Sequence, residues 1–268
     1  MTVGSFGLRP QDAPQGRIVD EGSSRTVIRW IVLLYGIVAY LAFGTVFAVM
    51  IGFVADIDLV RSIDAGTTAP LPAAIAIDVA LLAVFGVTHS VMARPWFKDA
   101  FARMLPPTAE RSTYVLVASL SLALLAWEWR ALPAVVWSVS PPASYALWTV
   151  SGAGIALVVY STFLTSHFDL FGLRQVVLAA LGREYTPVPF TERSLYRIVR
   201  HPMMSGMLLW FWAAPTMSVG HLIFTAGMTV YIVVGVRFEE RALAHAHGEA
   251  YRAYCARLPA FFPAARRS

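Results

Sequence analysis

Long apolar stretches alternate with short polar segments along most of the chain. Four of these stretches are long enough for a helix to cross the roughly 30 Å hydrocarbon core of a bilayer. They lie near residues 27–54, 71–93, 111–129 and 143–163. A fifth stretch, from Pro202 to Val236, carries no formal charge, and as one straight helix it would be about 50 Å long. It must therefore fold back, and Pro215 and Gly220 mark the turn. The pattern predicts an all-α integral membrane protein with about six membrane segments, the last two forming a short helical hairpin.

The polar segments predict how the rest of the chain is organised. Residues 1–26 mix Gly, Pro, Ser and charge, which indicates a mobile cytoplasmic lead before a single membrane domain over residues 27–268. Within that domain we expect a four-span bundle over 27–165 and a ligand-binding C-terminal part over 166–268. Polar and apolar residues alternate in that part near residues 165–175, and Leu243, Tyr251, Tyr254 and Leu258 repeat at helical spacing. Both patterns are typical of amphipathic helices at the inner membrane surface.

Composition and charge support this interpretation and add a topology. With 57% hydrophobic and 14% charged residues, the chain is too apolar for a soluble domain of 268 residues. All of its 21 Lys and Arg residues except Arg61 and Arg130 lie on alternate segments between the spans. By the positive-inside rule those segments, with both termini, are cytoplasmic. The scattered arginines form no single basic face, which argues against nucleic-acid binding, and a single Cys255 excludes an intramolecular disulfide and a cysteine-built metal centre.

Charged residues of both signs are predicted to meet at the cytoplasmic mouth of the hairpin. A helix that begins at Pro202 points its free N–H groups toward this mouth, where the carboxylate of a ligand would bind beside an arginine. A glutamate at the other end of the hairpin would balance a cation, so S-adenosylmethionine satisfies both signs. The charged residues are Arg197, Arg200, His201, Glu239 and Glu240. The alternative is that the arginines are topological anchors and the glutamates their surface partners.

Several runs of residues resemble known membrane methyltransferases. Arg200-His201-Pro202-Met203-Met204-Ser205-Gly206, followed by Phe238-Glu239-Glu240, resembles the C-terminal signature of the isoprenylcysteine carboxyl methyltransferase superfamily. Within it, the chain is more similar to the bacterial methanethiol S-methyltransferases and their NnrU relatives, on the basis of residues 88–94, 110–114 and 167–175. The resemblance covers about residues 27–263. Met204 stands where the superfamily has tyrosine, so a contact made by that tyrosine is not expected here.

The resemblance implies an activity and a set of cofactor-binding residues. It implies methyl transfer from S-adenosylmethionine to a small volatile thiol, methanethiol giving dimethyl sulfide, in a bacterial inner membrane. By position, we assign the cofactor contacts to Gln175, Arg197, Arg200, His201, Pro202, Gly206 and one of Glu239 and Glu240. Adjacent helical residues point about 100° apart, so only one of these glutamates faces the pocket.

Methylation of a thiol also requires a proton acceptor, because the thiolate is the nucleophile. We expect His167, oriented by Asp169, to be this base, with His89 as the second candidate; both histidines lie at the inner ends of predicted spans. For His167 and Asp169 there is an alternative, in which His167 caps the fourth span and Asp169 binds a nearby arginine.

Three other functions stay open from the sequence. A related methyltransferase would act on another thiol, a lipid or a prenylated acceptor. A membrane reductase would bind NADPH through the same arginines. A non-enzymatic NnrU-like membrane protein, such as an assembly factor or transporter, would transfer no methyl group; the intramembrane polar residues lie near the span ends, which argues against a transport path.

Overall fold

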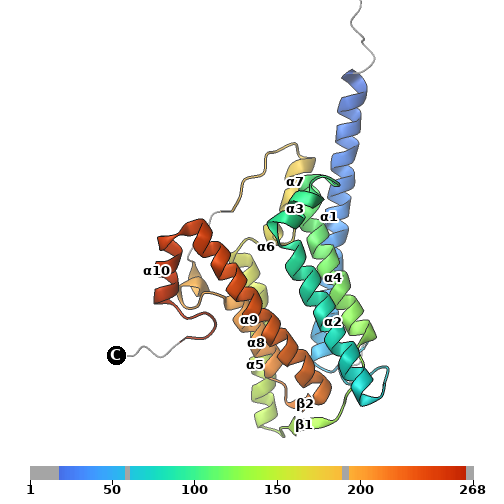
Figure 1. Cartoon of the computed structure of the whole chain (residues 1–268), viewed down its shortest axis with the longest axis vertical. Helices are drawn as coiled ribbons and strands as arrows, with labels where there is room; N and C mark the ends of the chain where they lie inside the picture. The colour runs from blue at the N-terminus through green and yellow to red at the C-terminus, as the bar shows by residue number, and fades with distance from the viewer. Residues whose placement is uncertain (1–17, 58–60, 189–192, 264–268) are drawn as a thin grey trace, which may run out of the picture.

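The computed structural model describes residues 18–57, 61–188 and 193–263 and is built mainly of helices (Figure 1). Five helices among the described residues are long and apolar enough to cross a membrane. They are α1 (Ile18–Val54), α2 (Leu71–Met92), α4 (Glu110–Glu128), α5 (Ala143–Leu164) and α9 (Val219–His247). The four long predicted spans are therefore confirmed, and most of their predicted ends lie within a few residues of the ends of these helices.

Shorter elements connect and cover these helices. The helical ones are α3 (Pro95–Phe101), η1 (Pro107–Ala109), α6 (His167–Leu170), α7 (Leu173–Ala180), η2 (Ser194–Arg197), α8 (Pro202–Trp212) and α10 (Glu249–Arg257). Two short strands, β1 (Val135–Ser138) and β2 (Thr216–Ser218), pair antiparallel at the lower end of the bundle in Figure 1, which we call the outer end after the predicted orientation.

The predicted hairpin is present, but its first arm does not cross a membrane. α8 has 11 residues and is therefore about 16 Å long, roughly half of the hydrocarbon core. The expectation of six membrane segments is corrected to five candidate spans and one half-length helix. The turn between α8 and α9 contains β2, which pairs with β1 from the α4–α5 connection. This strand pair was not expected, and it satisfies backbone groups that a bare turn would leave without partners.

Two helices extend beyond their predicted ends. α1 begins at Ile18, whereas the sequence pattern placed the start of the first span near Val27; residues 1–17 lie outside the described residues. α9 continues through Glu240 to His247 and ends at Gly248, whose φ of 58° suits a glycine. The predicted C-terminal amphipathic helix is thus divided, because its first part continues α9 and its second part is α10.

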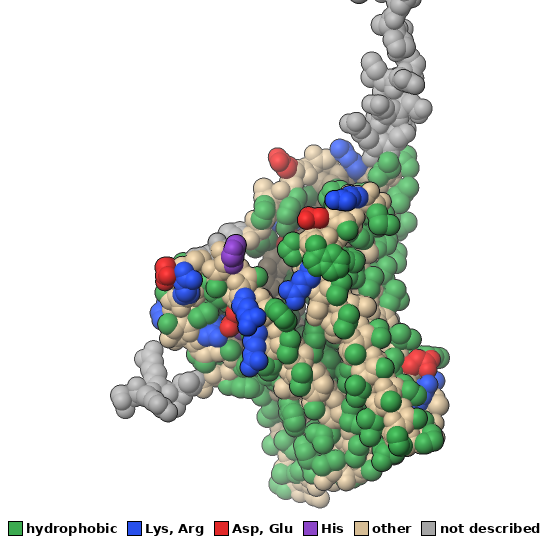
Figure 2. Space-filling model, viewed as in Figure 1, with side chains coloured by type: hydrophobic (Ala, Val, Ile, Leu, Met, Phe, Trp, Pro, Cys, Tyr) green, Lys and Arg blue, Asp and Glu red, His purple; other side chains and the backbone are tan. Residues whose placement is uncertain are grey.

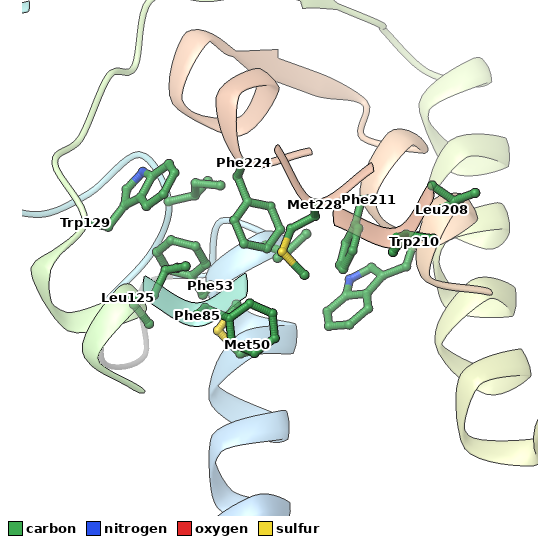
Figure 3. Packing of buried hydrophobic residues seen from close by; sticks show 14 of the residues in the cluster. Met50, Phe53, Phe85, Leu125, Trp129, Leu208, Trp210, Phe211, Phe224 and Met228 are labelled. Carbon is green, nitrogen blue, oxygen red and sulfur yellow. The ribbon is translucent and has the colours of Figure 1, made fainter. Parts of the chain in front are cut away.

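An aromatic core joins the helices in the outer half (Figure 3). The rings of Phe53, Trp129 and Phe224 stand edge to face, with centroids 5.9–6.0 Å apart. These three side chains come from α1, the end of α4 and α9, and each is at most 2% exposed. Edge-to-face contacts add to the gain from burial, so this core fixes the outer ends of three candidate spans.

Two glycines bring α5 and α8 into backbone contact. A Cβ atom on Gly154 would lie 2.6 Å from the carbonyl oxygen of Gly206, and one on Gly206 would lie 2.7 Å from that of Gly154. Gly154 and Gly206 thus let the two helices approach closely. Gly152 on the same helix makes no such contact, because nothing lies within 4 Å of a Cβ built there.

Candidate functional site

A cluster of charged side chains closes the inner end of the hairpin. Arg200 Nε donates a 2.7 Å hydrogen bond to Glu240 Oε1, and His201 Nε2 lies 3.0 Å from the same oxygen. Glu239 Oε2 is 3.7 Å from His201 Nδ1, and the Glu239 side chain is 52% exposed against 24% for Glu240. Glu240 is therefore the inward member of the acidic pair, and Glu239 keeps much of its carboxylate available to a ligand.

Arg200 also holds the C-terminal segment in place. Its Nη1 donates to the carbonyl oxygens of Cys255, at 3.0 Å, and of Leu258. The backbone N–H groups of Arg200 and His201 donate to the carbonyls of Pro259 and Ala260, at 3.0 and 2.9 Å. Much of the donor capacity of this guanidinium is thus used within the protein, which makes Arg200 a supporting residue of the mouth.

Phenol groups from two elements lie within electrostatic range of Glu239. Burial, followed by the negative charge of Glu239, raises the pKa of Tyr196 to about 12. Glu239 also acts electrostatically on Tyr114 of α4, a helix of the opposite side of the molecule. Figure 2 shows that the surface is hollowed in its upper half between these two sides, with Lys and Arg side chains at the border. A cation that approaches the half-exposed Glu239 carboxylate therefore has a neutral phenol within electrostatic range as well.

His89 faces the same seam from α2. Its ring centroid is 4.7 Å from that of Tyr114 and 6.0 Å from that of Tyr231 on α9. Its Nδ1 atom is buried without a hydrogen-bond partner among the described residues. A buried polar atom of this kind marks a place where a ligand or a water is needed to complete the hydrogen bonding.

His167 is held by partners that the sequence did not predict. Its Nε2 lies 2.8 Å from the Tyr40 hydroxyl of α1, and its Nδ1 lies 2.7 Å from Thr162 Oγ1 of α5. Its ring stacks on Phe163, with centroids 4.3 Å apart and an angle of 6° between the planes. Burial lowers the pKa of His167 below its ordinary value, so the neutral imidazole prevails at neutral pH.

The expectation that Asp169 orients His167 is wrong. Asp169 Oδ1 accepts a 2.9 Å hydrogen bond from Arg174, and Oδ2 accepts one of 3.2 Å from the Tyr185 hydroxyl. Residues two apart on a helix point to nearly opposite sides, and α6 is helical from His167 through Asp169. The structure instead agrees with the alternative, in which Asp169 binds a nearby arginine, here Arg174.

The other predicted cofactor residues are spread over several places. Pro202 occupies the first turn of α8, as expected, and Arg197 ends η2 on the exposed surface. Gln175 donates to the Asp169 backbone carbonyl at 3.0 Å, and its Oε1 is buried without a partner among the described residues. Gly206 lies in the α5–α8 contact, which by itself accounts for a glycine at this position.

Tyr40 and Thr162 were not among the residues singled out from the sequence. Tyr40 and Thr162 each sit in an apolar span, where a hydroxyl group needs a partner inside the protein. The sequence therefore indicates that each of these hydroxyl groups has a hydrogen-bond partner, but it does not identify that partner.

A separate cavity lies at the opposite end of the bundle. It has a volume of about 250 Å³ and is lined by Trp148, Trp210 and His221, among others, near the α8–α9 turn. This cavity and the charged mouth lie at different ends of the spans. The cavity is therefore separate from the site that His201, Glu239 and Glu240 form.

Comparison with known proteins gives one family and several similar chains. The profile of the NnrU protein family matches residues 79–262. The chain is 49% identical over 227 residues to the methanethiol S-methyltransferase of Mycobacterium tuberculosis, a match covering 84% of this chain and 93% of that protein. It is 46% identical over 244 residues to methanethiol S-methyltransferase 1 of Bradyrhizobium diazoefficiens, covering 91% and 86%. No solved structure matches the chain significantly.

Proposed function

The chain belongs to the NnrU protein family, and from this premise we propose that it is a membrane enzyme that methylates methanethiol to dimethyl sulfide with S-adenosylmethionine. The observation that carries the proposal is the match of nearly the full length of relatives named for this activity, which includes the charged mouth and both candidate histidines. The proposal also agrees with a membrane-embedded site, since methanethiol is small and apolar.

The donor groups at the mouth suit S-adenosylmethionine. When bound, this cofactor supplies an electrophilic methyl group on a sulfonium cation. We propose that the half-exposed Glu239 carboxylate, which has the neutral Tyr196 phenol within electrostatic range, binds the cationic end, and that the exposed Arg197 binds the carboxylate end. Arg200 and Glu240 would act as supports that keep His201 and the C-terminal segment in position.

The chain itself must then align and activate the thiol. A dry pocket that holds sulfur, methyl carbon and leaving sulfur in line lowers the entropic part of the barrier. A base must remove the thiol proton, since the thiolate is the reactive form. We propose His167 as this base, because its two ring nitrogens are ordered by hydrogen bonds and its neutral form prevails at neutral pH. His89 is the second candidate, because its Nδ1 is left without a partner.

Headspace detection of dimethyl sulfide tests the function. Detergent-solubilised protein is given S-adenosylmethionine and methanethiol, and wild type is expected to form dimethyl sulfide. His167→Ala is expected to lose turnover while it still binds the cofactor. If His89→Ala alone loses turnover, the base is His89. A wild-type protein that binds NADPH and not S-adenosylmethionine would contradict the proposal, and one that binds S-adenosylmethionine without methylating methanethiol would point to a larger acceptor.

The cofactor placement has its own test. Glu239→Gln removes the charge and keeps the shape, and we expect the dissociation constant of S-adenosylmethionine to rise by about 10- to 100-fold, since one charge-assisted contact is worth about 1.5–3 kcal/mol. Glu249→Gln is the matched control, because Glu249 is 87% exposed and pairs with Arg252 on the surface of α10. Equal affinity of the two variants would remove Glu239 from the cofactor site.

We further propose that the protein lies in a bacterial inner membrane with both termini and the mouth in the cytoplasm. The distribution of Lys and Arg supports this orientation. A cytoplasm-active reporter fused after Ser268 is expected to be active. Activity of a periplasm-specific reporter at the same position would reverse the topology.

A further inference from the structure

Three side chains from three helices form a continuous hydrogen-bonded row around His167. The Tyr40 hydroxyl of α1 lies 2.8 Å from His167 Nε2 of α6. His167 Nδ1 lies 2.7 Å from Thr162 Oγ1 of α5. Thr162 Oγ1 in turn donates to the backbone carbonyl of Val159 at 2.7 Å. The row therefore begins at a phenol and ends at a backbone carbonyl.

This arrangement sets the direction of every hydrogen bond in the row. A threonine hydroxyl has one proton, and Thr162 Oγ1 lies 2.7 Å from both the Val159 carbonyl and His167 Nδ1. Both contacts are hydrogen bonds only when Thr162 donates to the carbonyl and accepts from His167, which places the ring proton on Nδ1. Nε2 consequently carries a lone pair and accepts the proton of Tyr40. The imidazole can thus take a proton at Nε2. Within the row, the Tyr40 phenol is the only group hydrogen-bonded to Nε2.

The surroundings of Tyr40 suit a small sulfur compound. Its ring lies among those of Phe43, Phe168 and Phe171, with centroids 6.2–6.5 Å away. Sulfur makes favourable contacts with the edges of aromatic rings. Phe168 is 51% exposed and Phe163, which stacks on His167, is 57% exposed. An apolar thiol dissolved in the lipid therefore reaches an aromatic wall that contains the Tyr40 hydroxyl.

The row also lies near the proposed cofactor residues. Thr165, between Thr162 and His167 in sequence, is close enough to Tyr196 to favour the ionised form of its phenol. Tyr196 is in turn within electrostatic reach of Glu239. The α5–α6 connection thus links the row to the proposed binding site of the sulfonium at Glu239.

We propose that Tyr40 is a catalytic residue that contacts the thiol and passes its proton to His167, an inference that rests on the proposed function. The S–H bond breaks and its electron pair stays on sulfur as the thiolate. The proton goes to Tyr40 Oη while the original hydroxyl proton moves to His167 Nε2. Tyrosine ends neutral, His167 becomes an imidazolium, and its extra proton leaves to water after the methyl transfer. Thr162 is a positioning residue that holds Nδ1–H throughout.

Tyr40→Phe tests the catalytic part of the proposal. The variant keeps the ring packing and removes the hydroxyl, and loss of a proton-transfer group lowers turnover about 100-fold or more. Affinity for S-adenosylmethionine is expected to stay unchanged. The loss is expected to shrink with hydrogen sulfide, a stronger acid than methanethiol that needs less help to ionise. A merely structural role of the hydroxyl would reduce turnover equally for both substrates.

Tyr35→Phe is the matched control. Tyr35 lies on the same helix and donates a 2.7 Å hydrogen bond to a threonine, Thr113 Oγ1, in place of a histidine. We expect its turnover to stay within about twofold of wild type, in line with the loss of one ordinary hydrogen bond. If Tyr40→Phe matched Tyr35→Phe while wild type was active, the relay would be overturned and the proposed function would stand.

A second measurement does not depend on activity. Nitrogen-15 spectra of histidine-labelled protein report which ring nitrogen carries the proton, with His167→Gln identifying the signal. We expect the Nδ1–H form in wild type and in Thr162→Ser, and a mixture of forms in Thr162→Val. The Nε2–H form in wild type would overturn the relay. A wild type that forms no dimethyl sulfide would overturn the proposed function, and with it the role of Tyr40 toward methanethiol.

Discussion

The outer and inner halves of the helical bundle are held together by different forces. In the outer half, Phe53, Trp129 and Phe224 are almost completely buried and pack edge to face, and β1 and β2 tie the helix connections together. The inner half has a smaller apolar cluster around Val176 and adds polar contacts, such as the Arg200–Glu240 pair and the Tyr40–His167 hydrogen bond. The comparison indicates that the outer half supplies a fixed scaffold, and that the inner half keeps a hollow with polar groups around it.

This division has an energetic reason. Tight packing gives stability that does not depend on a ligand, whereas a buried charge pair returns little after its desolvation cost. We therefore expect substitutions in the outer half to change the amount of folded protein. Substitutions in the inner half are expected to change binding or turnover of protein that still folds.

The largest expected effect comes from Gly154→Leu at the α5–α8 contact. The new side chain would overlap the backbone of Gly206 and Trp210, whose atoms lie 2.6 Å from the Cβ position. Backbone cannot move aside as a flexible side chain does, so the cost exceeds the roughly 1–3 kcal/mol of ordinary overpacking. We expect loss of the folded peak in size-exclusion chromatography. Gly152→Leu is the control and should elute as wild type, because its Cβ position is open.

A smaller but still large loss is expected from Phe53→Ala in the outer core. Removing a fully buried phenylalanine costs about 3–5 kcal/mol of the free energy of unfolding, and Phe53 is 0% exposed. Thermal unfolding in detergent should shift to lower temperature, while turnover per folded molecule at low temperature stays near wild type. Leu41→Ala on the same helix is the control, since Leu41 is 62% exposed. A fall in turnover of folded Phe53→Ala would show that the two halves are coupled.

The pH dependence of turnover sharpens the comparison at the inner half. The base must be neutral to accept a proton, and burial lowers the pKa of His167 below the ordinary histidine value of about 6.5. Turnover should therefore persist as the pH falls through 6.5 and decline only at lower pH, where the imidazole becomes protonated. The measurement is the initial rate of dimethyl sulfide formation at saturating substrates, with cofactor affinity followed at each pH. A midpoint above pH 7 would contradict His167 as the base.

The smallest effect is expected where an ion pair is exposed. Lys98 Nζ lies 3.2 Å from Glu110 Oε1, but the side chains are 43% and 34% exposed. Such pairs contribute about 0–1 kcal/mol. Lys98→Met should leave the unfolding temperature and the turnover close to wild type. A large loss of turnover in this variant would mean that α3 takes part in the site, contrary to the division drawn here.

Much of the fold could be predicted from the sequence by itself. The candidate spans, the hairpin at Pro202 and the return of the Glu239–Glu240 end to His201 follow from local hydropathy, turn residues and the thickness of a bilayer. These features depend on residues close together in the chain, and the bilayer limits their length. For the same reason the sequence determined that the chain is a helical membrane protein with charges gathered at one end of its spans.

The tertiary structure alone decided which side chains meet. Tyr40 and His167 are 127 positions apart, and their contact depends on how α1 is rotated against α6, which no local pattern encodes. The orientation of Asp169 away from His167, the choice of Glu240 over Glu239 as the partner of Arg200, and the strand pair at the outer end have the same origin. Periodicity determines which face of a helix is apolar, whereas the packing of several helices at once decides which residues share a hydrogen bond.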